Sequence, residues 1–184
     1  MRVLALSGSL RRGSYNTQLL RAAEELAPAG VELELYDGLA AVPPYDADGD
    51  TADPPAAVRR LRERLAAADA VLVATPEYNS SIPGQLKNAL DWASRPFPEN
   101  ALRNRPVAVV GASAGAYGAM WAQAELRKVL GAIGARVVEG GVAVAQALER
   151  FNAEGDLVDG ELREQLAEVL RNLVAVARPA AVAA

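Results

Sequence analysis

Two polar loops of this 184-residue chain carry the residue types that could bind a ligand. The first spans residues 8–17 and follows the apolar segment 3–6, and the second spans 75–84 and follows the apolar segment 71–74. In an open parallel sheet, ligands bind beyond the carboxyl ends of the strands, where the strand order reverses. Because each loop follows a strand-like segment, we expect both loops at one edge of a sheet, with one ligand between them.

The first loop has the chemistry of a phosphate site. It precedes a helical pattern, and a helix N-terminus offers free backbone N–H groups and the positive end of the helix dipole. Arginine suits phosphate oxygens because of its planar fork of donors. The hydroxyl and guanidinium groups come from Ser7, Ser9, Arg11, Arg12, Ser14 and Thr17. The alternative is that Ser14 or Asn16 only caps the helix and the arginines are solvated.

The better-known nucleotide motifs are absent from this loop. Gly8 and Gly13 have the spacing of a Walker loop, but Ser14-Tyr15 stands where that motif requires lysine followed by serine or threonine. The Gly-x-Gly-x-x-Gly fingerprint of dinucleotide-binding folds is missing too. The loop therefore favours a monophosphate over nucleoside triphosphate hydrolysis.

The second loop suits the edge of a planar heterocycle. Between Pro76 and Pro83 it presents backbone donors and acceptors together with the aromatic face of Tyr78. The alternative is a helix entry capped by Ser80 or Ser81, with the tyrosine packed on the surface. A third loop, at 111–118, is rich in small residues that let a backbone approach a ligand closely. Its alternative is a loose turn between a strand and a helix.

Composition narrows the chemistry further. The chain has no cysteine, which excludes disulfides, thiolate nucleophiles, zinc fingers and iron–sulfur clusters, and no histidine, the usual general base. We therefore expect no metal site and no catalytic side chain, with the reactivity supplied by a cofactor. The net charge of −4 gives no basic face for nucleic acid. Neither a membrane span nor a secretory signal is evident, so a cytoplasmic protein is expected.

Apolar segments rich in β-branched residues alternate with helical patterns, which is typical of βαβ units and a parallel sheet. The predicted strands are 2–6, 31–36, 70–75, 107–111 and 136–144, and the predicted helices are 16–26, 56–67, 85–93, 119–133 and 161–177. We therefore predict an α/β fold: a single doubly wound domain over residues 1–178, with a five-stranded parallel sheet and helices on both faces. Residues 37–54 are predicted to be a long loop, either solvated or part of an interface, and 179–184 a disordered tail.

Two kinds of side chain on the predicted helices are given structural roles. Trp92 and Trp121 are expected to pack in the core or against another subunit. The charged residues are expected to be solvated, namely Lys87, Asp91, Glu125, Arg127 and Lys128.

The loops resemble those of the NADPH-dependent FMN reductases, a family that includes quinone, azo-dye and chromate reductases. The resemblance rests on Gly-Ser-Leu-Arg-x-Gly-Ser-x-Asn at 8–16 and on Pro-Glu-Tyr-Asn-x-Ser-Ile-Pro-Gly-x-Leu-Lys-Asn-Ala-x-Asp-Trp at 76–92. It continues through Ser113-x-Gly115, the motif Leu-Arg-x-Val-Leu at 126–130, and the stretch 151–162. It implies a flavodoxin-like FMN-binding domain with strand order 2-1-3-4-5, and a homodimer or a dimer of dimers (homotetramer).

The resemblance also implies the site. FMN would be bound by Ser9, Arg11, Ser14, Tyr15, Asn16, Thr17, Pro76, Glu77, Tyr78, Asn79, Ser113, Gly115, Tyr117 and Gly118. The first loop would hold the phosphate, the second would line the isoalloxazine and ribityl chain, and the third would close the other side. Two departures stand out, because Ser80 and Ala119 occupy positions where the family often has glycine, and both could crowd the pocket.

The implied activity is an oxidoreductase with a ping-pong mechanism. NADPH, or NADH, would give hydride to bound FMN, and a quinone, another small acceptor or free flavin would then take the electrons. One alternative is a flavodoxin-like electron carrier, which would need an aromatic sandwich and a strongly acidic face; only Tyr78 and Tyr117 are candidates, and the charge is mild. A phosphosugar- or nucleotide-binding module without flavin is a third possibility.

Overall fold

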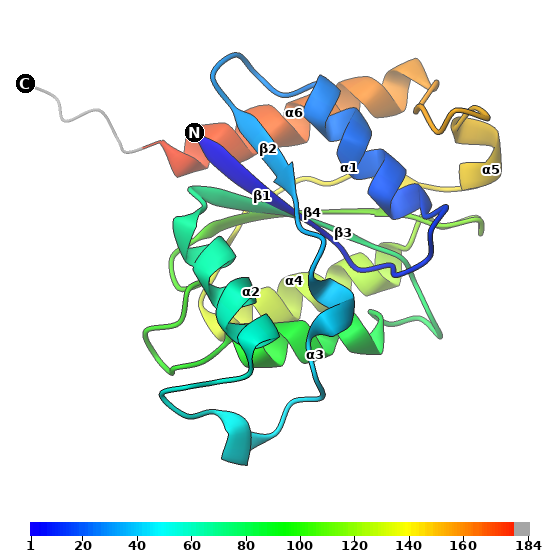
Figure 1. Cartoon of the computed structure of the whole chain (residues 1–184). Helices are drawn as coiled ribbons and strands as arrows, with labels where there is room; N and C mark the ends of the chain where they lie inside the picture. The colour runs from blue at the N-terminus through cyan, green and yellow to red at the C-terminus, as the bar shows by residue number, and fades with distance from the viewer. Residues whose placement is uncertain (179–184) are drawn as a thin grey trace, which may run out of the picture.

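The computed structural model describes residues 1–178 (Figure 1), so the tail expected at 179–184 lies outside the described residues. The strands are β1 (Arg2–Ser7), β2 (Glu32–Leu35), β3 (Ala70–Thr75), β4 (Pro106–Ala112), β5 (Arg136–Val137) and β6 (Ala143–Val144). The α-helices are α1 (Tyr15–Glu25), α2 (Ala56–Ala67), α3 (Gly84–Ala93), α4 (Met120–Ile133), α5 (Ala147–Arg150) and α6 (Gly160–Ala177). Two short 3₁₀ helices, η1 (Leu39–Ala41) and η2 (Ala47–Gly49), lie between β2 and α2.

The strands form one parallel sheet in the order β2-β1-β3-β4-β5, with β6 also paired to β4. This confirms the expected α/β doubly wound fold and the order 2-1-3-4-5. All residues of β3 and β4 are buried, because helices cover the sheet on both faces. Such strands are recognised in the sequence as continuous apolar runs.

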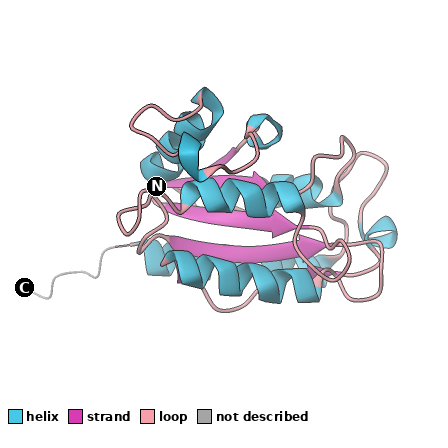
Figure 2. Ribbon diagram, turned by 90° about the horizontal axis from the view of Figure 1, so that it is seen from below, coloured by secondary structure: helices cyan, strands magenta, loops and turns pink. Residues whose placement is uncertain are grey.

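Helices α2, α3 and α4 cover one face of the sheet, and α1 and α6 cover the other (Figures 1 and 2). Alternate residues of each strand face the two layers. In β1, Leu4 and Leu6 pack toward α2 and α3, whereas Val3 and Ala5 pack toward α1 and α6. The central strands therefore anchor two hydrophobic cores at once, which fixes their register.

The helix boundaries follow local chemistry. The Ser14 hydroxyl accepts a hydrogen bond from the Asn16 N–H at the start of α1, and the Asp159 carboxylate accepts from two N–H groups at the start of α6. Helix α4 ends at Gly134, whose φ of 96° lies in the left-handed region. None of the helices between residues 1 and 178 is long and apolar enough to cross a bilayer.

The segment 37–54 is only partly solvated. Leu39 and Val42 are buried, and the indole Nε1 of the buried Trp92 donates to the Pro43 carbonyl at 2.9 Å. Gln85 of α3 also donates to the Leu39 carbonyl at 2.8 Å. The first part of this segment is therefore packed against α3, and Trp92 has the core position expected for it.

The expected strand 136–144 is wrong as a continuous element. The chain leaves the sheet after β5, turns through Gly140 with φ 86°, and returns as β6. The side chain of Arg127 of α4 bonds backbone groups where the strand is interrupted between β5 and β6. Its guanidinium donates to the carbonyls of Val138 at 2.8 Å and Val109 at 3.0 Å, and also to that of Gly140.

Arg127 is therefore not the solvated helix charge that the sequence suggested. Burial lowers the pKa of its guanidinium, although arginine keeps its charge at neutral pH. The side chain satisfies carbonyl groups that a continuous edge strand would otherwise have bonded. It thereby stabilises the interruption between β5 and β6.

We expect Arg127→Met to lower the free energy of unfolding by about 2 kcal/mol, because buried carbonyls lose a charged donor. Urea denaturation of the purified protein measures this. The neighbouring Lys128 is exposed, so Lys128→Met is the matched control and should change stability by less than about 0.5 kcal/mol. Equal stability of the two variants would contradict the bridging role of Arg127.

Candidate functional site

The carboxyl ends of β1, β3 and β4 border a cleft with a volume of about 290 Å³. Its lining comes from the loops that follow these three strands. The residues are Ser9, Arg11, Ser14, Tyr15, Asn16, Pro76, Glu77, Tyr78, Ala112, Ser113 and Ala114. The three loops that the sequence singled out thus meet at one edge of the sheet, as the strand order requires.

The first loop is organised by its own hydroxyl groups. Thr17 Oγ1 donates to Ser7 Oγ at 2.9 Å, and Ser7 Oγ donates to the Ser9 carbonyl at 3.3 Å. Ser14 Oγ accepts from the Asn16 N–H at 3.2 Å, so Ser14 caps α1. It also lines the cleft. Capping and ligand binding, which the sequence posed as alternatives, are compatible at this residue.

Asn16 joins the first loop to the end of β4. Its side-chain amide donates to the Ala112 carbonyl and accepts from the Ala112 N–H, both at 2.9 Å. The residue is buried, and the pair of bonds spans 96 positions of the chain. Asn16 therefore holds two walls of the cleft at a fixed separation.

Arg11 brings positive charge to the mouth of the cleft. Its guanidinium lies 5.4 Å from the centroid of the Tyr15 ring, which stacks in turn on Phe151 at 5.3 Å. Within residues 1–178 it pairs with no carboxylate. An exposed guanidinium beside the N-terminus of α1 is suited to an anionic group.

The second loop contains a tight hairpin turn. The N–H of Tyr78 donates to the Ser81 carbonyl at 3.0 Å, and the N–H of Ser81 donates to the Tyr78 carbonyl at 3.1 Å. Both central residues have positive φ, 52° at Asn79 and 60° at Ser80, as a type I′ turn requires. Helix α3 starts after Pro83 without a side-chain cap, so the alternative in which Ser80 or Ser81 only caps this helix is wrong.

Glu77 links the second loop to α4. Its Oε2 accepts from the backbone N–H groups of Trp121 at 3.0 Å and Ala122 at 3.1 Å. A carboxylate at a helix N-terminus is stabilised by the free donors and by the dipole. One feature of the sequence could have pointed to this contact: no side chain just before α4 is able to cap the helix, since Ala119 occupies the cap position.

The third loop is held by backbone bonds to β6 and to the segment that follows it. The Ser113 N–H donates to the Val144 carbonyl at 3.0 Å, and the Gln146 N–H donates to the Gly115 carbonyl at 2.9 Å. Gly118 has φ 55°, and a Cβ there would lie 2.4 Å from the backbone of Ala143. Glycine is required at this position because β6 packs directly against it.

Several predicted site residues lie outside the cleft lining. These are Thr17, Asn79, Gly115, Tyr117 and Gly118. Ala112 and Ala114, which were not among the predicted site residues, do line the cleft. Thr17 lies on the other side of the first loop, where it lines a separate cavity. Tyr117 is 59% exposed and packs edge-on against the exposed Trp121 at 4.8 Å.

Ser80 and Ala119, which stand where the family often has glycine, affect the backbone conformation and not the space in the cleft. Neither residue lines the cleft, so neither crowds it. Both adopt positive φ, 60° at Ser80 and 61° at Ala119. Glycine is favoured at such positions because other residues meet steric conflict in the left-handed region.

The cleft fits a flavin mononucleotide in its chemistry. The N-terminus of α1 suits a phosphate, as does Arg11, which pairs with no carboxylate within residues 1–178. The backbone at 76–78 and 112–114 can bond the polar edge of a ring.

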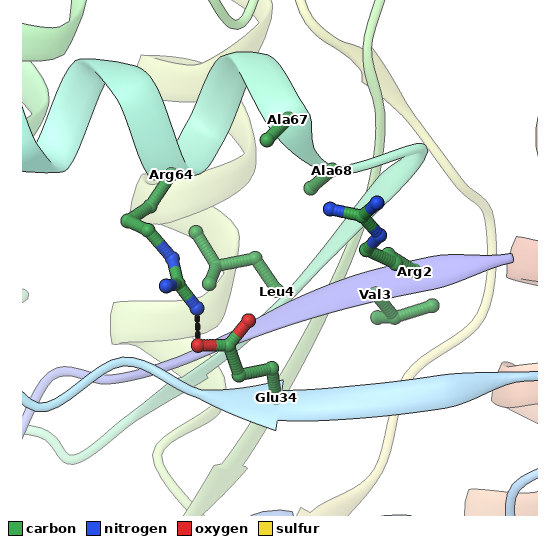
Figure 3. A pocket seen from close by; sticks show the side chains of 7 residues that line it. All are labelled: Arg2, Val3, Leu4, Glu34, Arg64, Ala67 and Ala68. Atoms are coloured by element: carbon green, nitrogen blue, oxygen red, sulfur yellow. Dashed lines mark ion pairs between the residues drawn. The ribbon is translucent and has the colours of Figure 1, made fainter.

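A smaller cavity of about 110 Å³ lies beside the first residues of β1 (Figure 3). There Arg64 pairs with Glu34, and the cavity lies away from the carboxyl edge where this architecture binds ligands.

Comparison with known proteins agrees with this geometry. The family model described as NADPH-dependent FMN reductase matches residues 1–149. The chain is 44% identical over 174 residues to an NAD(P)H-dependent FMN reductase of Pseudomonas aeruginosa, covering 94% of this chain and 93% of that protein. It is 37% identical over 167 residues to a 2-hydroxy-1,4-benzoquinone reductase of a Burkholderia species, covering 90% of each chain.

A solved structure shares the same fold over nearly the whole chain. The flavoenzyme NAD(P)H:(acceptor) oxidoreductase FerB from Paracoccus denitrificans superimposes with a TM-score of 0.84 at 36% sequence identity. The match covers 95% of this chain and 97% of that one.

The type I′ turn at 78–81 yields a stability prediction. Ser80→Gly should raise the free energy of unfolding by about 0.5–1 kcal/mol, because relief of the left-handed strain exceeds the added entropy of the unfolded chain. Ser80 is exposed, so no packing is lost. Ser81→Gly, at a position without positive φ, is the matched control and should not stabilise. Denaturant unfolding measures both, and an equal loss of stability in the two variants would refute the strain argument.

Proposed function

The chain belongs to the NADPH-dependent FMN reductase family, and from that premise we propose that the cleft at the carboxyl edge is its FMN site and that quinones are its electron acceptors. The protein is an NAD(P)H-dependent flavin oxidoreductase. The observation that carries the site assignment is the meeting of three separate loops around one cleft. Arg11 lines this cleft and pairs with no carboxylate in the described part of the chain.

The first loop binds the phosphate in this proposal. Ser14 and Ser9 offer hydroxyl groups at the start of α1, and Arg11 supplies positive charge. Asn16 acts indirectly, because its amide is bonded to both backbone groups of Ala112. It keeps the phosphate loop and the third loop in register with each other.

The second and third loops hold the ring. Residues 76–78 of the second loop line the cleft, and so do residues 112–114 at the end of β4 and in the third loop. The type I′ turn fixes Tyr78 at the rim, and the bond from Glu77 to the start of α4 prevents the two loops from separating. When bound there, FMN supplies the hydride-accepting and electron-donating chemistry that no side chain of this chain can supply.

In this proposal donor and acceptor use the same face of the bound ring. Tyr78 is 52% exposed and lines the cleft, so it offers a flat aromatic surface to a nicotinamide or a quinone. Because one face of the flavin admits one ring at a time, the donor leaves before the acceptor enters. The named relatives include a quinone reductase, which supports quinones as acceptors.

An enzyme is favoured over a flavodoxin-like electron carrier as the function of this chain. The named relatives are reductases. Tyr117, one of the two rings considered for an aromatic sandwich around the flavin, lies outside the cleft lining. We propose further that the protein acts in the cytoplasm as a homodimer or a dimer of dimers. The exposed Tyr78, Tyr117, Met120 and Trp121 beside the cleft support a subunit contact there.

Replacing Arg11 with a neutral residue tests the proposal that the first loop binds the flavin phosphate. Arg11→Gln should weaken FMN binding by the apoprotein about tenfold, because one charge-assisted hydrogen bond is lost. Arg12 is exposed and does not line the cleft, so Arg12→Gln should change the dissociation constant by less than about twofold. Quenching of flavin fluorescence measures both constants. Equal effects of the two changes would count against the assignment.

The proposal that donor and acceptor share one face of the flavin predicts ping-pong kinetics. Initial rates measured while NADPH and a benzoquinone are varied should give parallel lines in a double-reciprocal plot. High quinone should inhibit competitively against the nicotinamide, because both need the same face. Intersecting lines would show that donor and acceptor bind together and would refute the shared face.

A further inference from the structure

The stretch 151–162 was singled out in the sequence, yet none of its residues lines the cleft. It begins with Phe151, which is 7% exposed. The ring of Phe151 stacks on that of Tyr15, with the centroids 5.3 Å apart and the planes at 30°. Tyr15 is the first residue of α1 and does line the cleft. Phe151 therefore reaches the site through this one side chain.

The chain around Phe151 is a tight hairpin that is braced by its own polar groups. Asn152 Oδ1 accepts from the Asp156 N–H at 2.7 Å, and the Asn152 N–H donates to the Asp156 carbonyl at 3.0 Å. Gly155 has φ 95°, and a Cβ there would lie 2.8 Å from the side-chain nitrogen of Gln18 in α1. The hairpin therefore rests directly on α1 and holds Phe151 in one place.

The Tyr15 ring also contacts Arg11 of the first loop. The guanidinium carbon of Arg11 lies 5.4 Å from the centroid of the ring, within the range of a cation–π interaction. A Cβ on Gly13 would lie 3.4 Å from a terminal nitrogen of Arg11, so the guanidinium is folded over the loop that enters α1. Arg11 is exposed and pairs with no carboxylate within residues 1–178. The tyrosine ring is thus the surface against which this guanidinium rests.

A guanidinium held in this way is better prepared to bind an anion than a free one. An exposed arginine has many rotamers, and ordering it on a ligand costs conformational entropy. When the side chain already rests on an aromatic ring, part of that cost is met before the ligand arrives. The ring can do this only while it keeps its own position. Phe151 keeps it there, because a Tyr15 ring that turned away would lose the aromatic stack.

We propose that Phe151 is a positioning residue for the flavin phosphate: its ring fixes Tyr15, and Tyr15 holds the Arg11 guanidinium over the first loop. The inference rests on the proposed function, in which Arg11 binds the phosphate. It assigns to Phe151 an effect on the phosphate and not on the flavin ring, because the residue lies outside the cleft lining.

The test compares FMN with riboflavin, which has the same ring and ribityl chain but no phosphate. Phe151→Leu should weaken FMN binding by the apoprotein about two- to fivefold, the value of one exposed cation–π contact, and change riboflavin binding by less than about 1.5-fold. Quenching of flavin fluorescence measures both dissociation constants. Phe151→Tyr keeps the ring and should keep the parent's ratio of the two constants. Phe151→Met, which also lacks a ring, replaces Phe151→Leu if the latter does not fold.

Val169→Ala is the matched control for a loss of stability. Val169 of α6 is 3% exposed and belongs to the same hydrophobic core as Phe151, but it does not line the cleft. Both Val169→Ala and Phe151→Leu should lower the temperature of unfolding, because each removes buried apolar atoms. Only Phe151→Leu should lower the affinity for FMN relative to that for riboflavin.

The double variant measures the coupling to Arg11. In the Arg11→Gln background, Phe151→Leu should have no further effect on FMN binding, because no guanidinium remains to be positioned. The proposal would be overturned by unchanged FMN affinity in Phe151→Leu, by equal losses for FMN and riboflavin, or by a loss that persists in the Arg11→Gln background.

The proposed function is judged separately, by FMN binding to the parent and by Arg11→Gln alone. If Arg11→Gln weakens FMN binding and Phe151→Leu does not, only the positioning role is refuted. If Arg11→Gln binds FMN as the parent does, the phosphate assignment fails and the role of Phe151 fails with it.

Discussion

The register of three buried parallel strands is the constraint on which the site depends. β3 lies between β1 and β4, with Ser7 opposite Ala74 and Thr75 opposite Gly111. Because each strand packs against helices on both faces, a shift by one residue would exchange the two cores and is strongly disfavoured. The three strands consequently end at the same level, so the loops that follow them lie next to one another. The cleft is thus a consequence of core packing before any polar contact is considered.

Polar side chains then set the shape of the cleft by bonding backbone groups of distant elements. Asn16 joins α1 to the end of β4, Glu77 joins the second loop to α4, and Gln123 of α4 donates to the carbonyls of Gly118 at 3.0 Å and Val142 at 3.2 Å. Each of these side chains satisfies backbone groups that would otherwise be unpaired at the end of an element. Movement of one loop would break bonds in the next, so the three loops behave as one unit.

The sequence predicted the parts of this structure that leave a local pattern. Apolar runs and helical spacing identify β1, β3, β4 and the long helices, since each of these elements buries a regular face. The edge of the sheet at 136–144 was predicted wrongly, because Arg127 supplies from another element the bonds that a continuous strand would have made. The bonding partners of Glu77 could not be identified from its neighbours in the sequence, since they lie more than 40 positions away. Long-range bonds from side chains to backbone groups leave no periodic signal in a sequence.

The first loop illustrates why a chain without histidine or cysteine can still specify a reaction. The bonds from Thr17 to Ser7 and from Ser7 to Ser9 fix the first loop, which borders the cleft. Since a cofactor provides the electron chemistry, what this protein must control is the relative position of ligands. Neutral hydroxyls with fixed partners do this well, because their geometry does not change with pH in the physiological range.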